Sequence, residues 1–357
     1  MFTKWFAEEG GPLETPAGRV FHEYPHPNNW KELVNELFSR FGSDGVEIPL
    51  ELCPCGKRKA TIRRFLVARK YKIDDAEKML RDTIKWRQSV TIGGVTGVRN
   101  IILSKPRWDL LSMNRKIIPA TPFLCYTKQG FPVYSLRLGK GDGSLATAAP
   151  DECHIYCSIV RGEHLVNKIF PEAQKLHETK LSRRGITSSL DQTSALTRHE
   201  NEPYTDDDLD VIDKQIVIVD LDGISMSALR CLYVFKLINS VASCNYPELS
   251  KAIYVLNSPP VFDYIWSAIK PLLAAHTRNK VRIFQMGPEQ YGALQEILED
   301  DDIPDYLTPQ VNEENVKGRV GCVPDADEPD FRPEGVRDFD AWLENSSEAL
   351  DKTCPFP

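Results

Sequence analysis

The second half of the chain contains apolar runs of two kinds, and their order predicts a sheet covered by helices. Residues 215–219, 253–256 and 281–284 are short runs rich in Val, Ile and Leu, which is typical of strands buried on both faces. Residues 225–242 and 261–273 lie between them with apolar side chains at helical spacing. Strands that alternate with helices in this way predict βαβ units, and therefore an α/β fold with a mostly parallel sheet.

The first part of the chain has helical spacing instead. Apolar residues recur every three or four positions in 30–41, and a helical pair is expected at 62–66 and 74–84. Asp74 is placed to cap the second helix of this pair, and Glu77 lies three residues further on, as in a capping box. This part is therefore expected to form a helical unit ahead of the sheet.

Polar composition marks one internal segment and the end of the chain. Residues 171–213 contain few large apolar side chains, which predicts an exposed insertion. After residue 309 the sequence is acidic and rich in Pro, although a last helix at 338–350 is expected to pack back through Phe339, Trp342 and Leu343. We expect four parts, namely an N-terminal arm with a short helix at 1–50, a helical part at 51–106, an α/β domain at 107–310 and an acidic tail at 311–357.

The distribution of charge limits what the protein binds. The formal net charge is −7, and eight Lys and Arg residues gather between residues 52 and 73, whereas Asp and Glu collect from residue 299 onward. A net acidic chain lacks the basic face that nucleic acids require, so we expect no nucleic-acid partner. One basic end could instead face an anionic membrane surface while the acidic end is repelled by it.

Nine cysteines occur without regular spacing, and the first residues do not read as a secretory signal. No run approaches the roughly 20 apolar residues that cross a bilayer. We therefore expect reduced thiols, a cytosolic-type compartment and no disulfide framework.

A series of short motifs occurs in a fixed order between residues 60 and 310. They are Arg-Phe-Leu-Val-Ala-Arg-Lys-Tyr at 64–71, Trp-Arg at 86–87, Gly-Phe-Pro-Val-Tyr at 130–134, Val-Asp-Leu-Asp-Gly-Ile-Ser at 219–225, Tyr-Pro-Glu at 246–248, Asn-Ser-Pro at 257–259 and Phe-x3-Trp-x3-Lys-Pro-Leu at 262–272. Each motif alone is weak, but the ordered set resembles the CRAL-TRIO (Sec-fourteen-like) family of lipid-binding and lipid-transfer proteins.

This resemblance implies a CRAL-TRIO fold, in which an N-terminal helical subdomain precedes a mixed sheet covered by helices, with a hydrophobic lipid pocket. It also implies a gate helix at 260–273 that opens at a membrane. The apolar stripe of that segment suits such a role, because Phe and Trp are favoured at the headgroup boundary. The expected function is non-catalytic binding and transfer or presentation of a lipid, by a cytoplasmic protein that associates peripherally with membranes. Phosphatidylinositol and other phospholipids or hydrophobic molecules are the candidate ligands.

The resemblance also suggests which residues hold the lipid. Arg69, Lys70 and Lys270 match bases that grip a headgroup in phosphoinositide-binding members of the family, and they could bond to a phosphate. Leu237 stands where those members carry Glu, so the headgroup pattern is incomplete, and a solvated basic helix end is the alternative interpretation of Arg69 and Lys70. The expected residues of the pocket and gate are Val133, Tyr134, Leu136, Val217, Val219, Leu237, Tyr254, Leu256, Phe262, Ile265, Trp266 and Ile269.

The sequence also allows two functions other than lipid transfer, a phosphatase and an interaction scaffold. The strand that ends in Asp220-Leu221-Asp222-Gly223 resembles the nucleophile strand of haloacid-dehalogenase-type phosphatases, although the downstream Lys and acidic pair are not found at strand ends. Two Asp residues that bond within a strand-to-helix turn explain the same residues. The third possibility is a protein-interaction or regulatory scaffold with a vestigial lipid pocket. We expect no catalytic residues, no bound metal and no cofactor other than the lipid ligand.

Overall fold

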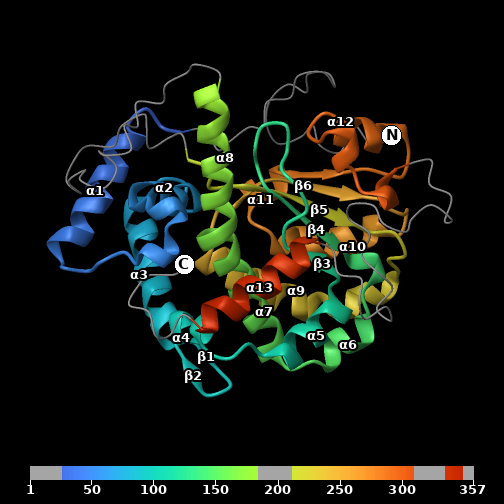
Figure 1. Cartoon of the computed structure of the whole chain (residues 1–357), viewed down its shortest axis with the longest axis horizontal. Helices are drawn as coiled ribbons and strands as arrows, with labels where there is room; N and C mark the ends of the chain where they lie inside the picture. The colour runs from blue at the N-terminus through green and yellow to red at the C-terminus, as the bar shows by residue number, and fades with distance from the viewer. Residues whose placement is uncertain (1–25, 184–210, 309–333, 349–357) are drawn as a thin grey trace.

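The computed structural model describes residues 26–183, 211–308 and 334–348 (Figure 1). Its centre is a five-stranded sheet of order β3-β4-β5-β6-β7, in which β3 is antiparallel to β4 and the other pairs are parallel. The strands are β3 (Ala120–Thr121), β4 (Val133–Arg137), β5 (Gln215–Asp220), β6 (Ser250–Leu256) and β7 (Val281–Ile283). The predicted α/β class with a mixed, mostly parallel sheet is confirmed.

Helices precede the sheet, connect its strands and follow it. The first group is α1 (Trp30–Ser43), α2 (Arg58–Ala68), α3 (Ile73–Ser89), α4 (Val98–Leu103), α5 (Trp108–Ile117), α6 (Gly143–Ala148), α7 (Asp151–His164) and α8 (Phe170–Arg183), with a hairpin of β1 (Thr91–Ile92) and β2 (Val95–Thr96). The second group is α9 (Leu232–Asn245), α10 (Phe262–Ile269), α11 (Ala275–Asn279), α12 (Pro288–Gln295) and α13 (Glu334–Glu348). Two 3-10 turns matter below, η7 (Met226–Cys231) and η8 (Lys270–Leu272).

Two sets of side chains leave the sheet on opposite faces, because consecutive residues of a strand alternate. Ile218 and Tyr254 are register partners and pack with Leu294 of α12. Val217 and Val219, on the other face of β5, pack with the side chains of α10. α12 and α10 therefore cover opposite faces of the sheet (Figure 1).

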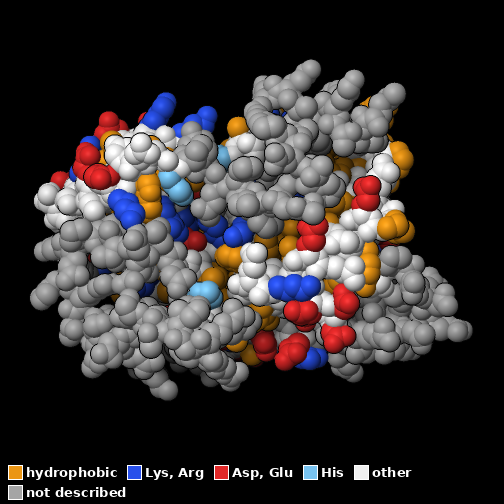
Figure 2. Space-filling model, turned by 90° about the horizontal axis from the view of Figure 1, so that it is seen from above, with side chains coloured by type: hydrophobic (Ala, Val, Ile, Leu, Met, Phe, Trp, Pro, Cys, Tyr) orange, Lys and Arg blue, Asp and Glu red, His pale blue; other side chains and the backbone are white. Residues whose placement is uncertain are grey.

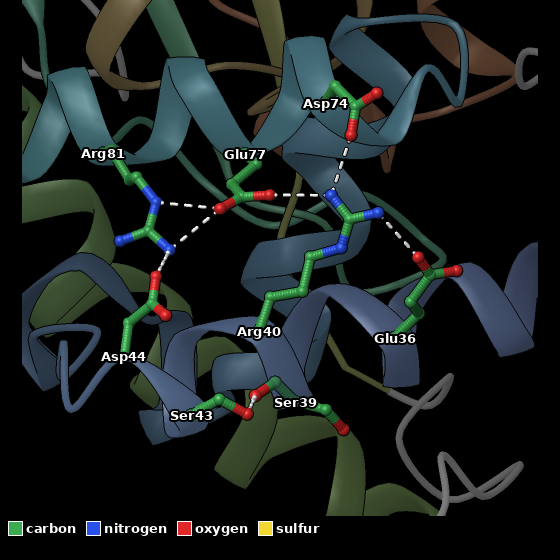
Figure 3. A network of polar contacts seen from close by, with 8 residues as sticks. All are labelled: Glu36, Ser39, Arg40, Ser43, Asp44, Asp74, Glu77 and Arg81. Atoms are coloured by element: carbon green, nitrogen blue, oxygen red, sulfur yellow. Dashed lines mark hydrogen bonds and ion pairs between the residues drawn. The ribbon is translucent and has the colours of Figure 1, made fainter.

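An ion-pair network fastens α1 to α3 (Figure 3). Arg40 donates to Asp74 and Glu77 at 2.8 Å each and to Glu36 at 2.7 Å. Glu77 also accepts a hydrogen bond of 2.9 Å from Arg81. The predicted capping box is wrong, since α3 has no side-chain cap and both carboxylates bond to Arg40 instead.

The segment expected to be an exposed insertion begins inside a packed helix. α8 runs to Arg183, and its residues Phe170 and Ala173 are buried in a cluster with Val241 and Tyr246. Phe170 and Ala173 thus anchor the first turn of a helix whose composition is otherwise polar. Residues 184–210 lie outside the described part of the chain.

The last helix packs back onto the molecule as predicted. α13 begins at Glu334 and buries Phe339, Trp342 and Leu343 in one cluster with residues of α4 and α7. These three side chains occur at helical spacing, which is why their role could be predicted. The C-terminal part of the described chain therefore belongs to the same core as the helices that precede the sheet.

Candidate functional site

The two faces of the sheet are packed to different extents. On the α12 side, six strand residues have exposed fractions of 2% or less, namely Val133, Ile216, Ile218, Ala252, Tyr254 and Leu256. On the other side, Val217 and Val219 of the central strand keep 8% and 9%, and Tyr134, Leu136 and Ile253 are only half-buried. The helices on this side therefore leave apolar strand surface accessible in the middle of the sheet. We name it the α10-side face, formed by Tyr134, Leu136, Val217, Val219, Ile253, Val255, Val281 and Ile283.

The structure separates the predicted wall residues into two groups. Tyr134, Leu136, Val217 and Val219 share the α10-side face. Val133, Tyr254 and Leu256 lie on the opposite face, in the cluster that contains α12. These three residues therefore do not lie beside α10 in this structure, and the sequence could not separate the two groups, because a run that is apolar at every position does not indicate which half of it points to which face.

α10 presents the predicted apolar stripe to the sheet. Phe262 and Ile265 are buried, with exposed fractions of 4% and 1%, and Trp266 and Ile269 are half-buried against the same cluster. The rings of Phe262 and Trp266 lie 6.2 Å apart. In this structure the stripe covers the α10-side face, so its large side chains are turned away from solvent.

Large hydrophobic side chains are nevertheless exposed on the elements that cover the α10-side face. Tyr264 of α10, Met226 of η7 and Tyr233 of α9 are exposed, and η7 packs against both α10 and α9. We name these three residues the outer patch. Figure 2, a view from above Figure 1, shows Lys and Arg side chains mainly on the left, over the helical part, and hydrophobic side chains over the right.

The predicted headgroup bases lie on different elements. Arg69 and Lys70 are exposed and follow the last residue of α2, where Lys70 has a left-handed backbone with φ of 52°. A surface hollow of about 320 Å³ beside Arg69 is also lined by Lys78, Asp75 and Asp82, so two carboxylates balance its two cations. Lys270 is half-buried in η8.

Lys270 and the position that lacks the expected acid lie on two elements that a hydrogen bond joins. η8 is joined to α9 by a hydrogen bond of 3.3 Å from Asn239 Nδ2 to the Leu272 carbonyl. Leu237, half-buried on α9, precedes Asn239 by two residues. No ion pair involving Lys270 occurs among the described residues. Arg69 and Lys70, which follow α2, share no hydrogen bond or ion pair with η8 among those residues.

Sequence reasoning missed one cation beside the α10-side face. Arg161 of α7 is half-buried, and its Nη2 donates a hydrogen bond of 2.7 Å to Asn114 Oδ1. Burial raises the pKa of the Tyr134 hydroxyl, and the charge and hydrogen bond of Arg161 oppose that rise, which places the guanidinium next to this residue of the face. The available signal was a single Arg within the apolar helical segment 153–170.

The strand-end aspartates are engaged in structural bonds. Asp220 is fully buried and accepts hydrogen bonds from Arg137 Nε at 3.1 Å, Asn257 Nδ2 at 2.8 Å and the backbone N–H of Asp222 at 2.9 Å. Asp222 in turn forms an ion pair of 2.7 Å with Lys140. Within the described ranges, no group of three His, Cys, Asp or Glu side chains could hold a metal ion. The carboxylates therefore fix the ends of β4, β5 and β6, as the turn interpretation expected.

The described helices are all too short or too polar to span a bilayer. Comparison with known proteins then shows what the chain is similar to. The CRAL/TRIO domain model matches residues 191–308. "Protein real-time" of Anopheles gambiae is 26% identical over 255 residues, which is 69% of this chain and 31% of that protein.

A second relative is the "Phosphatidylinositol/phosphatidylcholine transfer protein SFH11" of Arabidopsis thaliana, 24% identical over 249 residues, or 69% of this chain and 56% of that protein. The chain thus spans about a third to just over half of the length of these two relatives. A solved structure titled "Crystal structure of Sfh5" matches 76% of this chain and 85% of that one, with a TM-score of 0.49 and 13% identity. The domain match over residues 191–308, the relatives and the ordered motifs together support the resemblance of this chain to the CRAL-TRIO family.

Proposed function

We propose that the protein binds one lipid against the α10-side face and transfers or presents it at membranes without catalysis. The unequal packing of the two sheet faces carries this proposal, because Val217 and Val219 keep accessible apolar surface at the centre of the sheet. Each methylene group that a lipid buries there contributes about 0.8 kcal/mol. The CRAL/TRIO domain match supports lipid binding in general, and the transfer activity printed in the name of the Arabidopsis relative supports transfer.

The outer patch is our candidate for membrane contact. Its side chains Tyr264, Met226 and Tyr233 are already exposed, whereas Trp266 faces the sheet and reaches hydrocarbon only if α10 moves. We propose that the outer patch rests on the bilayer and that α10 then moves to admit the lipid. The seven described cysteines are free, which supports a reducing, cytosolic-type compartment and a peripheral association with its membranes.

Phospholipids, with phosphatidylinositol among them, are the ligands that we propose to test first. The name of the Arabidopsis relative includes phosphatidylinositol and phosphatidylcholine. Lys270 lies at the end of the covering helix, where a headgroup phosphate would be within its reach if the lipid entered there. Arg69 and Lys70 remain a second pair of candidate headgroup bases. The double variant Arg69→Ala with Lys270→Ala tests whether Arg69 and Lys270 both contribute to the loading of anionic lipids, which should fall.

An interaction or regulatory protein with a filled pocket is the alternative function. The close packing of Phe262 and Ile265 against the sheet favours it. Lipid uptake distinguishes the two functions, because a filled pocket takes up no ligand.

A substitution that enlarges a side chain on the α10-side face tests the proposal directly. Val219→Trp should occupy the accessible surface and lower lipid transfer between vesicles to the background rate, while the unfolding midpoint changes little. Ser227→Trp, on exposed η7, is the matched control and should transfer normally. If Val219→Trp transfers lipid as the wild type does, or destabilises the fold by the 1–3 kcal/mol typical of an overpacked core, the face is not the lipid site.

A further inference from the structure

Arg161 holds a fixed position beside the α10-side face. It lies on α7, one turn before the end of that helix, and its hydrogen bond to Asn114 joins α7 to α5. Asn114 is 1% exposed, so this acceptor is rigid. The guanidinium is therefore oriented by a neutral partner that does not satisfy its charge.

Two other buried or half-buried arginines near the sheet bond to carboxylates. Arg87 pairs with Glu163 at 2.6 Å, and Arg137 pairs with Asp220 at 3.1 Å. Arg161 forms no ion pair among the described residues, and Glu163, two positions along the same helix, is already bound by Arg87. A cation taken out of water without a counter-charge is costly, so an anion that arrives at Arg161 would be bound strongly.

Two further polar groups lie near the guanidinium. Asn114 Nδ2 is buried and has no acceptor within the described part of the chain. The Tyr134 hydroxyl is next to Arg161 and belongs to a side chain of the α10-side face. A guanidinium without a counter-charge thus lies near a hydroxyl and a buried amide at the edge of an apolar surface, and such polar groups beside an apolar wall suit the polar end of an amphiphile.

We propose that Arg161, with Asn114 and Tyr134, binds the oxyanion of a lipid that lies on the α10-side face. The ligand class is an amphiphile that ends in a carboxylate or a phosphate, since both groups accept charge-assisted hydrogen bonds from a planar guanidinium. This inference rests on the proposed lipid binding and names the chemistry of the ligand's polar end. It places the charged end inside the molecule, away from Arg69 and Lys70, which follow α2.

Three probes with the same tail test the inference, namely oleic acid, oleyl phosphate and oleyl alcohol. Each is added to the full chain, and the bound fraction is measured by native mass spectrometry. The wild type should retain at least one of the two anions about tenfold more than the alcohol, a preference of the size that one charge-assisted contact supplies. The probe that is retained distinguishes a carboxylate from a phosphate ligand.

Variants then assign the preference to a residue. Arg161→Gln should remove it while alcohol binding continues, and Arg161→Lys should keep part of it. Arg230→Gln, on exposed η7, is the matched control and should keep all of it. If Arg161→Gln still prefers the anions, or if the wild type binds the alcohol and the anions equally, the inference is overturned and lipid binding stands. If the wild type retains none of the three probes, the proposed function falls and the inference falls with it.

Discussion

The guanidinium of Arg87 donates two hydrogen bonds to the carboxylate of Glu163, Nη1 to Oε1 at 2.6 Å and Nη2 to Oε2 at 3.0 Å. The Tyr246 hydroxyl donates to the same Oε1 at 2.7 Å, and Asn167 Nδ2 donates to Oε2 at 3.2 Å. Arg87 and Tyr246 come from two of the motifs that define the resemblance, and Glu163 lies between them on α7. The network joins α3 to the helices beside the sheet.

Neutralising Glu163 should destabilise the fold, because it leaves the Arg87 charge buried without a counter-charge. We expect Glu163→Gln to lower the free energy of unfolding by about 3–5 kcal/mol, measured by urea denaturation. The double variant Arg87→Met with Glu163→Leu should lose less than the single one, since it removes both charges. A loss of under about 1 kcal/mol for Glu163→Gln would show that the ion pair of Arg87 and Glu163 does not hold α3 to α7.

The buried His164 predicts a dependence of stability on pH. Burial, with the charge of Lys168, lowers the pKa of His164 to about 3, and its ring lies 5.0 Å from the rings of Phe339 and Trp342. The unfolded chain binds a proton near the ordinary pKa of 6.5, so the contribution of neutral His164 is complete above that pH. It falls as the pH decreases from 6.5 toward 3, by up to about 1.4 kcal/mol per pH unit.

A comparison of variants isolates this term from the titration of carboxyl groups. Between pH 6.5 and 5.5 the wild type should lose roughly 1 kcal/mol more stability than His164→Gln, which has no titrating ring. Equal slopes for the two proteins would mean that burial does not lower the pKa of His164 in the folded state.

α13 should contribute substantially to stability, because Trp342 and Leu343 are buried in the cluster shared with α4 and α7. We expect Trp342→Ala to cost about 3–5 kcal/mol in urea denaturation, as for other large buried aromatic residues. Asn345→Ala, at an exposed position of the same helix, should cost under about 0.5 kcal/mol. Similar small losses for both would indicate that α13 is not docked in solution.

Membrane contact by the outer patch predicts a specific transfer defect. Tyr264 is 70% exposed, so Tyr264→Asp should fold normally but transfer lipid at least tenfold more slowly, because a carboxylate resists the headgroup boundary. Met286→Asp is the matched control, as Met286 is 69% exposed on the segment between β7 and α12. Vesicle co-sedimentation and transfer should be normal for this control. A normal rate for Tyr264→Asp would move the contact surface away from α10.

The sequence allowed the sheet and the covering helix to be predicted, because each is defined by local spacing. β5 and β6 are apolar runs, and the inward stripe of α10 contains Phe262 and Ile265 at helical positions. Which side of β5 faces α10 could not be predicted, because both sides of that strand are buried and a one-residue shift exchanges them.

Long-range polar pairs escaped prediction for a different reason. Glu163 and Arg161 are two residues apart, yet one meets Arg87 and the other meets Asn114. Asp74 fitted a local cap and instead bonds to Arg40, which comes from another helix. Charged side chains pair with the groups that lie near them in the folded chain, and local sequence spacing does not indicate which groups those are.

Native mass spectrometry of the purified protein, with extraction and identification of any bound molecule, tests the central claim most directly. The account predicts one lipid per chain, or the uptake of one lipid when an empty protein is mixed with phospholipid vesicles, and the loss of that lipid in Val219→Trp. An empty protein that takes up nothing from the vesicles would contradict lipid binding and favour the interaction protein with a filled pocket.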